Sequence, residues 1–380
     1  MYNTERRIVN FYNNYCEIDQ NDKDSAWLNG NIDQIWKPQS GKCNLIQDDL
    51  QHLRLAKSDN KNELIHLKNV KFLFDHLYHT NLTYGYDCCN VACYDGGGKY
   101  AEGVLDGIFI EILNHLDIKS MYRAKNREGD NTELYPGQRG NISNNSNLDT
   151  SIISDVVDYE NLFAKLDEKL GFRLVFPDII GHQQKHITTS RGNITFRNLC
   201  GLYYMVYLNK ILETFTELDK KDITVLEIGA GTGWTAYWAK YFNFKKYTIV
   251  DIPSTNIVQA HFLINSIGSN DVYLSGETKN NSAFVKIIPA SEFKTLDSKY
   301  SIIVNFDGIT EYGNATALNY LKESMSKTNL FFSINHETEN GLSYTLKDIY
   351  TTIKEVDLVF RAKDNHRQDF CYYAELLRFL

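Results

Sequence analysis

The chain of 380 residues contains the stretch VLEIGAGTGW at positions 225–234, where a run of apolar residues leads into three closely spaced glycines. The apolar run is typical of a strand that is buried on both faces of a sheet. Glycines let the backbone turn tightly and approach a ligand, and a helical pattern begins at Thr232. The N–H groups at the start of that helix point toward the turn. We therefore predict that this turn binds a ligand at the end of a central strand.

The glycine spacing excludes two common nucleotide-binding loops. A dinucleotide-binding turn has the pattern G-x-G-x-x-G, but here Gly233 comes one position early and the bulky Trp234 follows it. A phosphate-binding loop requires Gly-Lys followed by Ser or Thr, which this stretch lacks. The remaining form, an acidic residue before G-x-G-x-G, is typical of enzymes that use S-adenosylmethionine. We therefore predict S-adenosylmethionine as the cofactor, with Glu227 near its methionyl ammonium.

A carboxylate at the end of the next expected strand supports this cofactor. Asp251 ends the apolar run at 247–251, where it can accept hydrogen bonds from both hydroxyls of a ribose. The residues that we predict to bind the cofactor are Glu227, Gly229, Ala230, Gly231, Gly233, Asp251, Ile252, Ser291 and Asn305.

Strand and helix patterns alternate through the second half of the chain, which indicates a parallel sheet covered on both faces. The expected parallel strands lie at 223–228, 247–251, 284–288, 300–306 and 330–334. Two further apolar runs, at 356–362 and 370–379, flank a charged turn and predict an antiparallel hairpin.

The first half has a different character. Helical patterns at 104–113 and 159–170 are separated by an Asn-, Gly- and Ser-rich loop at 124–155, and an amphipathic helix at 199–218 leads into the second half. We predict a mainly helical N-terminal domain at 1–175, a connecting loop and helix at 176–220, and an S-adenosylmethionine-binding domain at 221–380.

Charge and composition argue against several kinds of partner. The 40 Lys and Arg residues are outnumbered by 48 Asp and Glu, whereas nucleic-acid binding requires a basic surface. Residues 8–14 do not form the apolar core of a signal peptide, and no apolar run approaches the roughly 18 residues of a membrane span. We therefore expect a cytoplasmic protein with no nucleic-acid partner and no membrane span. The cysteines lack the spacing of a zinc site, so no metal site is predicted from them.

Four stretches between about 170 and 339 together suggest a family. They are ITTS at 187–190, VLEIGAG at 225–231, YTIVDIP at 247–253 with Gln259 and Ala260 after it, and Asn305 and Glu311 followed by FFSIN at 331–335. With these stretches the sequence resembles the class I S-adenosylmethionine-dependent methyltransferases. Within that class it is similar to the sugar O-methyltransferases encoded in bacterial surface-polysaccharide clusters.

This resemblance implies both a fold and an activity. The fold would be a Rossmann-like α/β domain with a seven-stranded, mostly parallel sheet whose last strand is antiparallel, and with the cofactor across the strand ends. The activity would be methylation of a sugar hydroxyl in capsule or lipopolysaccharide biosynthesis, with a nucleotide sugar or an oligosaccharide as the acceptor. Two positions depart from the family pattern, because Gly308 replaces a serine and Tyr312 replaces a methionine.

Polar residues after the fourth and fifth strands are the catalytic candidates. A hydroxyl acceptor needs a base within hydrogen-bond reach, and His336 is our first candidate because imidazole titrates near neutral pH. The alternative for His336 is a capping or packing role. Asp307 and Glu311 are the other catalytic candidates. Alternatively, they bind a divalent cation or are solvated residues near the start of a helix at Asn314.

The acceptor site is predicted to include His182 and His186, which precede the amphipathic helix, and Asn335. The two histidines are four apart, so zinc binding is an alternative for them. A second hypothesis for the whole chain keeps the cofactor and changes the acceptor to an amine or another hydroxylated metabolite. A third is a scaffold protein that has the fold without catalysis.

Overall fold

The computed structural model describes ten parts of the chain: residues 2–15, 98–117, 159–177, 187–251, 253–278, 280–312, 314–337, 345–364, 366 and 372–380. Four features expected from the sequence lie outside these described residues, namely His182, His186, Ile252 and the loop at 124–155. The side chain of Glu311 is also outside the description, although its backbone is within it.

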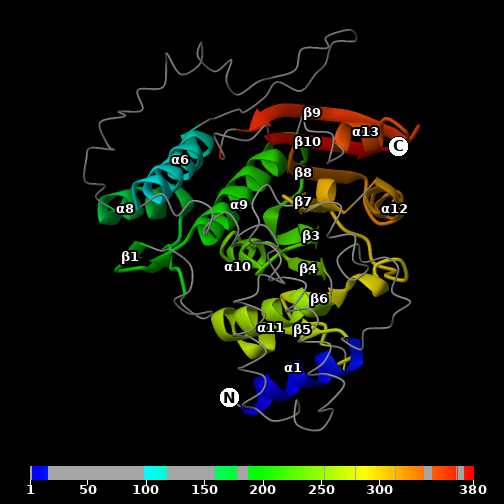
Figure 1. Ribbon diagram of the computed structural model, residues 1–380, viewed down its shortest axis with the longest axis horizontal. Coiled ribbons are helices and arrows are strands. Elements are labelled where there is room, and N and C mark those ends of the chain that lie inside the picture. The colour runs from blue at the N-terminus through cyan, green and yellow to red at the C-terminus, as the bar shows by residue number, and fades with distance from the viewer. Residues whose placement is uncertain are drawn as a thin grey trace, which may run out of the picture.

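An eight-stranded sheet forms the centre of the molecule, in the order β5-β6-β4-β3-β7-β8-β10-β9 (Figure 1). β10 runs antiparallel to both of its neighbours, and every other neighbouring pair is parallel. The strands are β3 (Thr224–Ile228), β4 (Lys246–Asp251), β5 (Val272–Leu274), β6 (Val285–Pro289), β7 (Ile302–Phe306), β8 (Leu330–His336), β9 (Val356–Asp364) and β10 (Tyr372–Phe379).

This topology confirms the Rossmann-like α/β fold with an antiparallel last strand. Within the described residues the sheet has eight strands rather than the expected seven, because β5 adds a parallel strand beside β6. β5 has three residues, which is too short for a strand pattern to be recognised in the sequence.

Helices cover both faces of the sheet (Figure 1). α9 (Phe196–Phe215), α10 (Trp234–Tyr241) and α11 (Pro253–Ile267) pack on the face that carries Val225, Ile249 and Ile287. α12 (Asn314–Met325) and α13 (Leu346–Tyr350) pack on the face that carries Leu226, Val250 and Ile288. Because successive side chains of a strand point to opposite faces, each apolar strand contributes to both layers of the core.

The described helices of the first half join the same core. α6 (Gly98–Asp117) lies beside α9, and α8 (Tyr159–Leu170) lies next to α6 (Figure 1). α1 (Tyr2–Tyr15) lies against α11 near β5 (Figure 1). β1 (Ile187–Thr189) and β2 (Gly192–Ile194) form a separate antiparallel hairpin. α9 begins after Thr195, whose side chain and that of Asn198 form a capping box. The division of the chain into an N-terminal domain and a cofactor domain stays a prediction.

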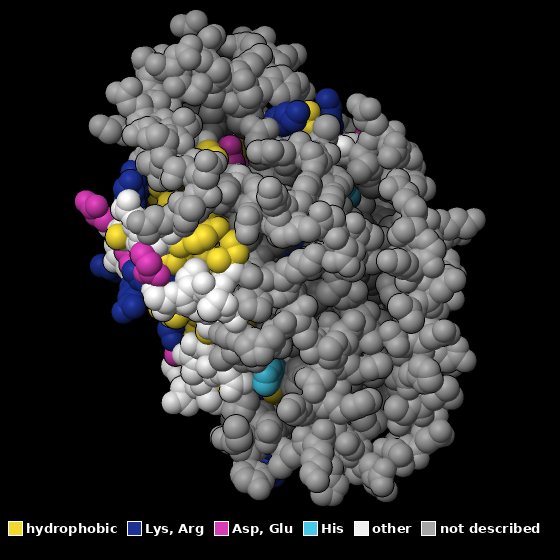
Figure 2. Space-filling model, turned by 60° about the vertical axis from the view of Figure 1, so that its left-hand side comes forward, with side chains coloured by type: hydrophobic (Ala, Val, Ile, Leu, Met, Phe, Trp, Pro, Cys, Tyr) yellow, Lys and Arg dark blue, Asp and Glu magenta, His cyan; other side chains and the backbone are white. Residues whose placement is uncertain are grey.

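Described side chains of both charges are visible on one face of the molecule (Figure 2). On the face in Figure 2, the described Lys and Arg side chains stand among Asp and Glu rather than forming a continuous basic area. Among the described residues, every helix is too short or too polar to cross a membrane.

Candidate cofactor and active site

The glycine turn has the geometry that its sequence predicts. Gly229, Gly231 and Gly233 have φ angles of 74°, 54° and 92°, which lie in the left-handed region that side chains with a Cβ rarely adopt. β3 ends directly before this turn and α10 begins directly after Gly233. The first N–H groups of α10 therefore stand at the turn, as a ligand site at a helix start requires.

Asp251 is held next to this turn by a buried glutamine. Gln259 on α11 donates one hydrogen bond from Nε2 to Asp251 Oδ2 at 2.7 Å and another to the Gly231 carbonyl at 2.8 Å. The carboxylate at the end of β4 and the glycine turn at the end of β3 are thus parts of one arrangement. Ser291 lies on the short 3-10 turn after β6 (Ala290–Glu292), where its side chain is exposed.

Glu227 lies beneath the turn and is fully buried. Its Oε2 accepts a hydrogen bond from the Tyr247 hydroxyl at 2.9 Å. Burial raises the pKa of Glu227 to about 8, and the nearby Asp251 charge adds to this, although hydrogen bonds from Tyr247 and Thr235 oppose it. A cationic group near Glu227 would favour its ionised form, which fits the predicted contact with a methionyl ammonium.

Asn305 and Asn335 are engaged in shaping the loop after β7. Asn305 donates from Nδ2 to the Ile228 carbonyl at 2.7 Å and accepts at Oδ1 from the Ile309 N–H at 2.8 Å. Asn335 donates to Asn305 Oδ1 at 2.9 Å and accepts from the Gly308 N–H at 2.8 Å. These contacts fix the ends of β3, β7 and β8 relative to one another. Binding of ligand by either amide stays a prediction.

Asp307 follows β7 in a left-handed backbone conformation, with a φ of 55°. Its Oδ1 accepts a hydrogen bond from the Tyr372 hydroxyl at 2.5 Å, and its Oδ2 pairs with Arg197 Nη1 at 3.3 Å. The Asp307 side chain is only 4% exposed. A non-glycine residue in this conformation is uncommon and points to a position constrained by its surroundings. Here the constraint is a carboxylate held between a guanidinium and a phenol.

His336 is the last residue of β8 and is buried. Its Nδ1 lies 3.0 Å from the hydroxyl oxygen of Thr310, and its ring stacks on that of Tyr372 with a centroid distance of 5.8 Å. These contacts fix the orientation of the imidazole at the same sheet edge as Asp307. The packing role considered for His336 is therefore observed, whereas its role as a base stays a prediction.

A second buried polar cluster lies near Asp307 and His336, and the sequence did not predict it. His366 hydrogen-bonds through Nδ1 to Asp364, whose Oδ2 accepts from the Tyr203 hydroxyl at 2.6 Å. Tyr204 places its hydroxyl 3.1 Å from His366 Nε2 and stacks on Phe306, the last residue of β7. Burial alone would raise the pKa of Asp364, but the charge and hydrogen bonds of His366 and the Tyr203 hydroxyl outweigh it, so that the pKa is lowered.

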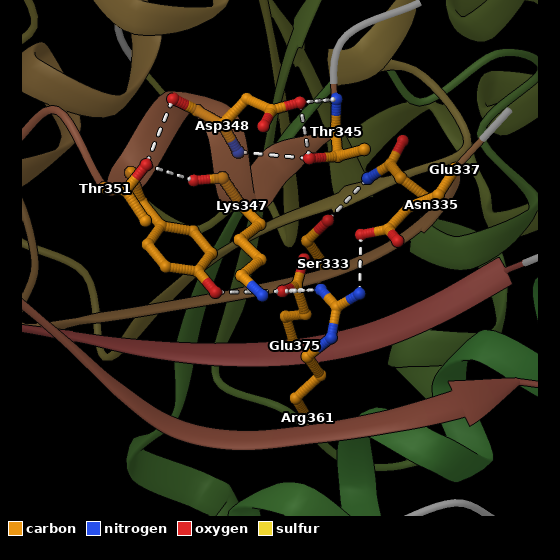
Figure 3. A network of polar contacts seen from close by, with 10 residues as sticks. Ser333, Asn335, Glu337, Thr345, Lys347, Asp348, Thr351, Arg361 and Glu375 are labelled. Carbon is orange, nitrogen blue, oxygen red and sulfur yellow. Dashed lines mark hydrogen bonds and ion pairs between the residues drawn. The ribbon is translucent and has the colours of Figure 1, made fainter. Parts of the chain in front are cut away.

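An ion network on the opposite face of the sheet holds Glu337, the residue directly after β8 (Figure 3). Arg361 on β9 pairs with Glu375 on β10 and with Glu337 at 2.7 Å. The Tyr350 hydroxyl of α13 donates to Glu375 at 3.3 Å. Burial raises the pKa of Glu375 to about 7 despite the neighbouring guanidinium. Because Glu337 comes next after His336, this network anchors the chain beside the candidate base.

These groups lie side by side at the end of the sheet where the parallel strands terminate. From β4 to β10 the order is Asp251, the glycine turn, Asp307, His336 and Tyr372, since β10 starts where the parallel strands end. The structure thus brings Glu227, the glycine turn, Asp251 and Asn305 together and places the catalytic candidates Asp307 and His336 on the adjacent strands. Ser291 has no described contact with this group, and its part in cofactor binding stays a prediction. No three His, Cys, Asp or Glu side chains gather to hold a metal ion within the described ranges.

Comparisons with known proteins find similarity to solved structures at low sequence identity. A scan against protein-family models finds no match, and a search of curated proteins finds none. Similar solved structures include magnesium protoporphyrin IX methyltransferase from Synechocystis PCC 6803 with bound SAM, at 10% identity and a TM-score of 0.35, covering 48% of this chain and 79% of that chain. A SAM-dependent methyltransferase from Aquifex aeolicus shows 15% identity and a TM-score of 0.31, covering 45% and 88%. Mitomycin 7-O-methyltransferase shows 9% identity and a TM-score of 0.35, covering 48% and 57%.

Proposed function

We propose that this chain is an S-adenosylmethionine-dependent O-methyltransferase that acts on a sugar hydroxyl in the synthesis of a bacterial surface glycan. The observation that carries the proposal is the order of these groups across the ends of the parallel strands. The carboxylate expected to bind a ribose, the glycine turn and the two acid–base candidates lie on the neighbouring strands β4, β3, β7 and β8. This order provides a donor site and a reaction site side by side.

The residues at the turn fit the proposed donor. All three glycines have a positive φ, and the space beside Gly231 is open. Asp251 offers a carboxylate for ribose hydroxyls, and Glu227 offers one for an ammonium. S-adenosylmethionine, when bound, supplies a methyl group on a positively charged sulfur. Gln259 hydrogen-bonds to both Asp251 and Gly231 and so fixes the carboxylate relative to the glycine turn. The ribose and the amino-acid end of the donor would therefore contact groups that are held at a fixed distance from each other.

The residues after β7 and β8 supply the chemistry of the acceptor side. His336 accepts the proton of the acceptor hydroxyl, which makes the oxygen a better nucleophile and is worth about 10²–10⁴-fold. Asp307 provides a fixed negative charge beside it, positioned by Arg197 and Tyr372. Asn335, His182 and His186 remain the proposed acceptor contacts, and Glu311 remains an additional candidate base.

The test has two measurements. Calorimetry with S-adenosylmethionine measures donor binding, and incubation with tritium-labelled donor measures methyl transfer to nucleotide sugars, oligosaccharides and a matched set of amines. We expect donor binding and transfer to a sugar hydroxyl, with Asp251→Ala weakening donor affinity and His336→Ala reducing transfer alone.

The other outcomes separate the alternatives. Transfer to amines only would replace the sugar by another acceptor. A folded protein that binds no donor would be a scaffold and would overturn the enzymatic proposal.

A further inference from the structure

The hydroxyl of Tyr312 lies directly against the first glycine of the turn. A Cβ added to Gly229 would stand 1.9 Å from Tyr312 Oη and 3.2 Å from the ring carbon Cζ. The same hydroxyl lies 3.5 Å from Asn305 Nδ2. Tyr312 follows the 3-10 turn Ile309–Glu311 after β7. It therefore comes from the segment that carries the proposed acceptor residues, yet its hydroxyl contacts the glycine turn proposed to bind the donor.

The two ends of the glycine turn have different neighbours. Gly231 is bound through its carbonyl to Gln259, which also holds Asp251 on β4. At Gly229, the position that a Cβ would take points toward the loop after β7, where the Tyr312 hydroxyl and Asn305 Nδ2 lie nearest to it. Since Asp251 is the carboxylate suited to ribose, the part of a donor that extends away from the ribose would lie toward Tyr312.

We propose that Tyr312 is a positioning residue for the methyl donor, and that its hydroxyl contacts the amino-acid end of that donor on the glycine turn. This inference rests on the proposed function. A phenol hydroxyl both donates and accepts hydrogen bonds, so it can pair with the carboxylate or the ammonium of that end. Any side chain at position 229 would overlap the hydroxyl, so that Tyr312 would have to move.

The test compares three ligands that share adenosine. S-adenosylmethionine and S-adenosylhomocysteine carry the amino-acid end, whereas 5′-methylthioadenosine lacks it. Calorimetry on Tyr312→Phe should show about tenfold or more weaker binding of the first two ligands, as expected for a lost hydrogen bond to a charged group. Binding of 5′-methylthioadenosine should change by less than about twofold.

The matched control is Tyr320→Phe. It removes a phenol hydroxyl from the neighbouring ring on α12, whose centroid is 5.7 Å from that of Tyr312. This variant should bind all three ligands as the wild type does. Equal weakening for all three ligands by Tyr312→Phe, no weakening, or tighter binding would each overturn the inference. A wild-type protein that binds none of the three would overturn the proposed function itself, which is a separate result.

A second measurement tests the geometry without any ligand. Gly229→Ala should lower the thermal midpoint more in the wild type than in the Tyr312→Phe background, where the hydroxyl that the new methyl group meets is absent. The strain of a positive φ is common to both backgrounds and cancels in the comparison. An equal loss in both would show that the hydroxyl does not lie on Gly229 and would contradict the inference.

Discussion

The hydroxyl of Tyr372 donates a hydrogen bond to Asp307 Oδ1 at 2.5 Å, which ties the first residue of β10 to the loop after β7. The two residues are separated by 65 positions in the chain. β10 is the strand that runs against the others, so its first residue stands at the edge where the parallel strands end. The antiparallel strand therefore contributes directly to the candidate active site.

Tyr372→Phe is expected to reduce methyl transfer while leaving donor affinity unchanged. The change removes one of the two groups that hold the Asp307 carboxylate, and loss of this buried hydrogen bond should lower the free energy of unfolding by about 1–3 kcal/mol. Steady-state kinetics and urea denaturation measure the two effects. Tyr373→Phe is the control, since Tyr373 is the next residue and its ring lies under Arg361 instead. Weaker donor binding by Tyr372→Phe would place this residue in the donor site and contradict the expectation.

Arg197→Met is expected to destabilise the protein by leaving the buried Asp307 carboxylate without its guanidinium. Breaking a fully buried pair costs about 3–5 kcal/mol, and because the Arg197 side chain is 18% exposed we expect about 1–3 kcal/mol. Adding Asp307→Asn to the Arg197→Met variant should recover part of this lost stability, since the amide carries no charge. A double-mutant cycle by urea denaturation gives the coupling. Additive losses would mean that the pair contributes no specific interaction.

Glu227→Gln is expected to flatten the pH dependence of stability in the ligand-free protein. The pKa of Glu227 is raised from 4.5 to about 8, so between these values the folded state holds a proton that the unfolded state has lost. Stability therefore falls as pH rises through this window, by about 1.4 kcal/mol per pH unit from this carboxyl, and levels off above pH 8.

The measurement is urea denaturation of the wild type and Glu227→Gln at pH 6, 7 and 8. Glu375, whose pKa is also raised by burial, acts in the same direction, so only the difference between the two proteins reports on Glu227. The control is Glu355→Gln, which changes an exposed carboxyl. Identical slopes for wild type and Glu227→Gln would show that Glu227 is ionised in the folded protein.

Thr310→Val is expected to lower the rate of methyl transfer by about tenfold and to shift its pH profile. Valine keeps the shape of threonine but removes the hydroxyl that lies 3.0 Å from His336 Nδ1, so the imidazole loses the contact that orients it. Thr310→Ser keeps a hydroxyl and should restore both the rate and the profile. Donor affinity, measured by calorimetry, should be the same in all three proteins. A Thr310→Val enzyme with an unchanged pH profile would remove His336 as the base.

The main strands and the glycine turn were predictable because their signals are local. Each long parallel strand is an apolar run between helices, and the turn carries glycines at the positions where φ is positive. An amphipathic helix was expected at 199–218. The helix spans Phe196–Phe215, because Thr195 caps its start and Thr216 ends it. Residues 198–209 are all buried, so the prediction of an amphipathic helix was wrong: α6 covers the side that was expected to face solvent.

The partners within the site were not predictable, because they come from distant parts of the chain. Arg197 lies 110 residues from Asp307, and Tyr203 lies 161 residues from Asp364. No spacing rule connects such pairs before the sheet order is known. His366 and Asp364 are near each other in the sequence, yet a charged turn is the ordinary interpretation of that stretch, and their burial becomes evident only in the fold.

The attachment of α1 determines when the chain can complete its folding. Arg7 forms a bidentate ion pair with Glu277 and donates hydrogen bonds to Ser269 and to the Val272 carbonyl. These partners lie 262 to 270 residues further along the chain. During synthesis, the apolar residues Ile8 and Phe11 of α1 precede the surface that buries them by more than two hundred residues. α1 can therefore dock in its final place only after α11 and β5 have been synthesised.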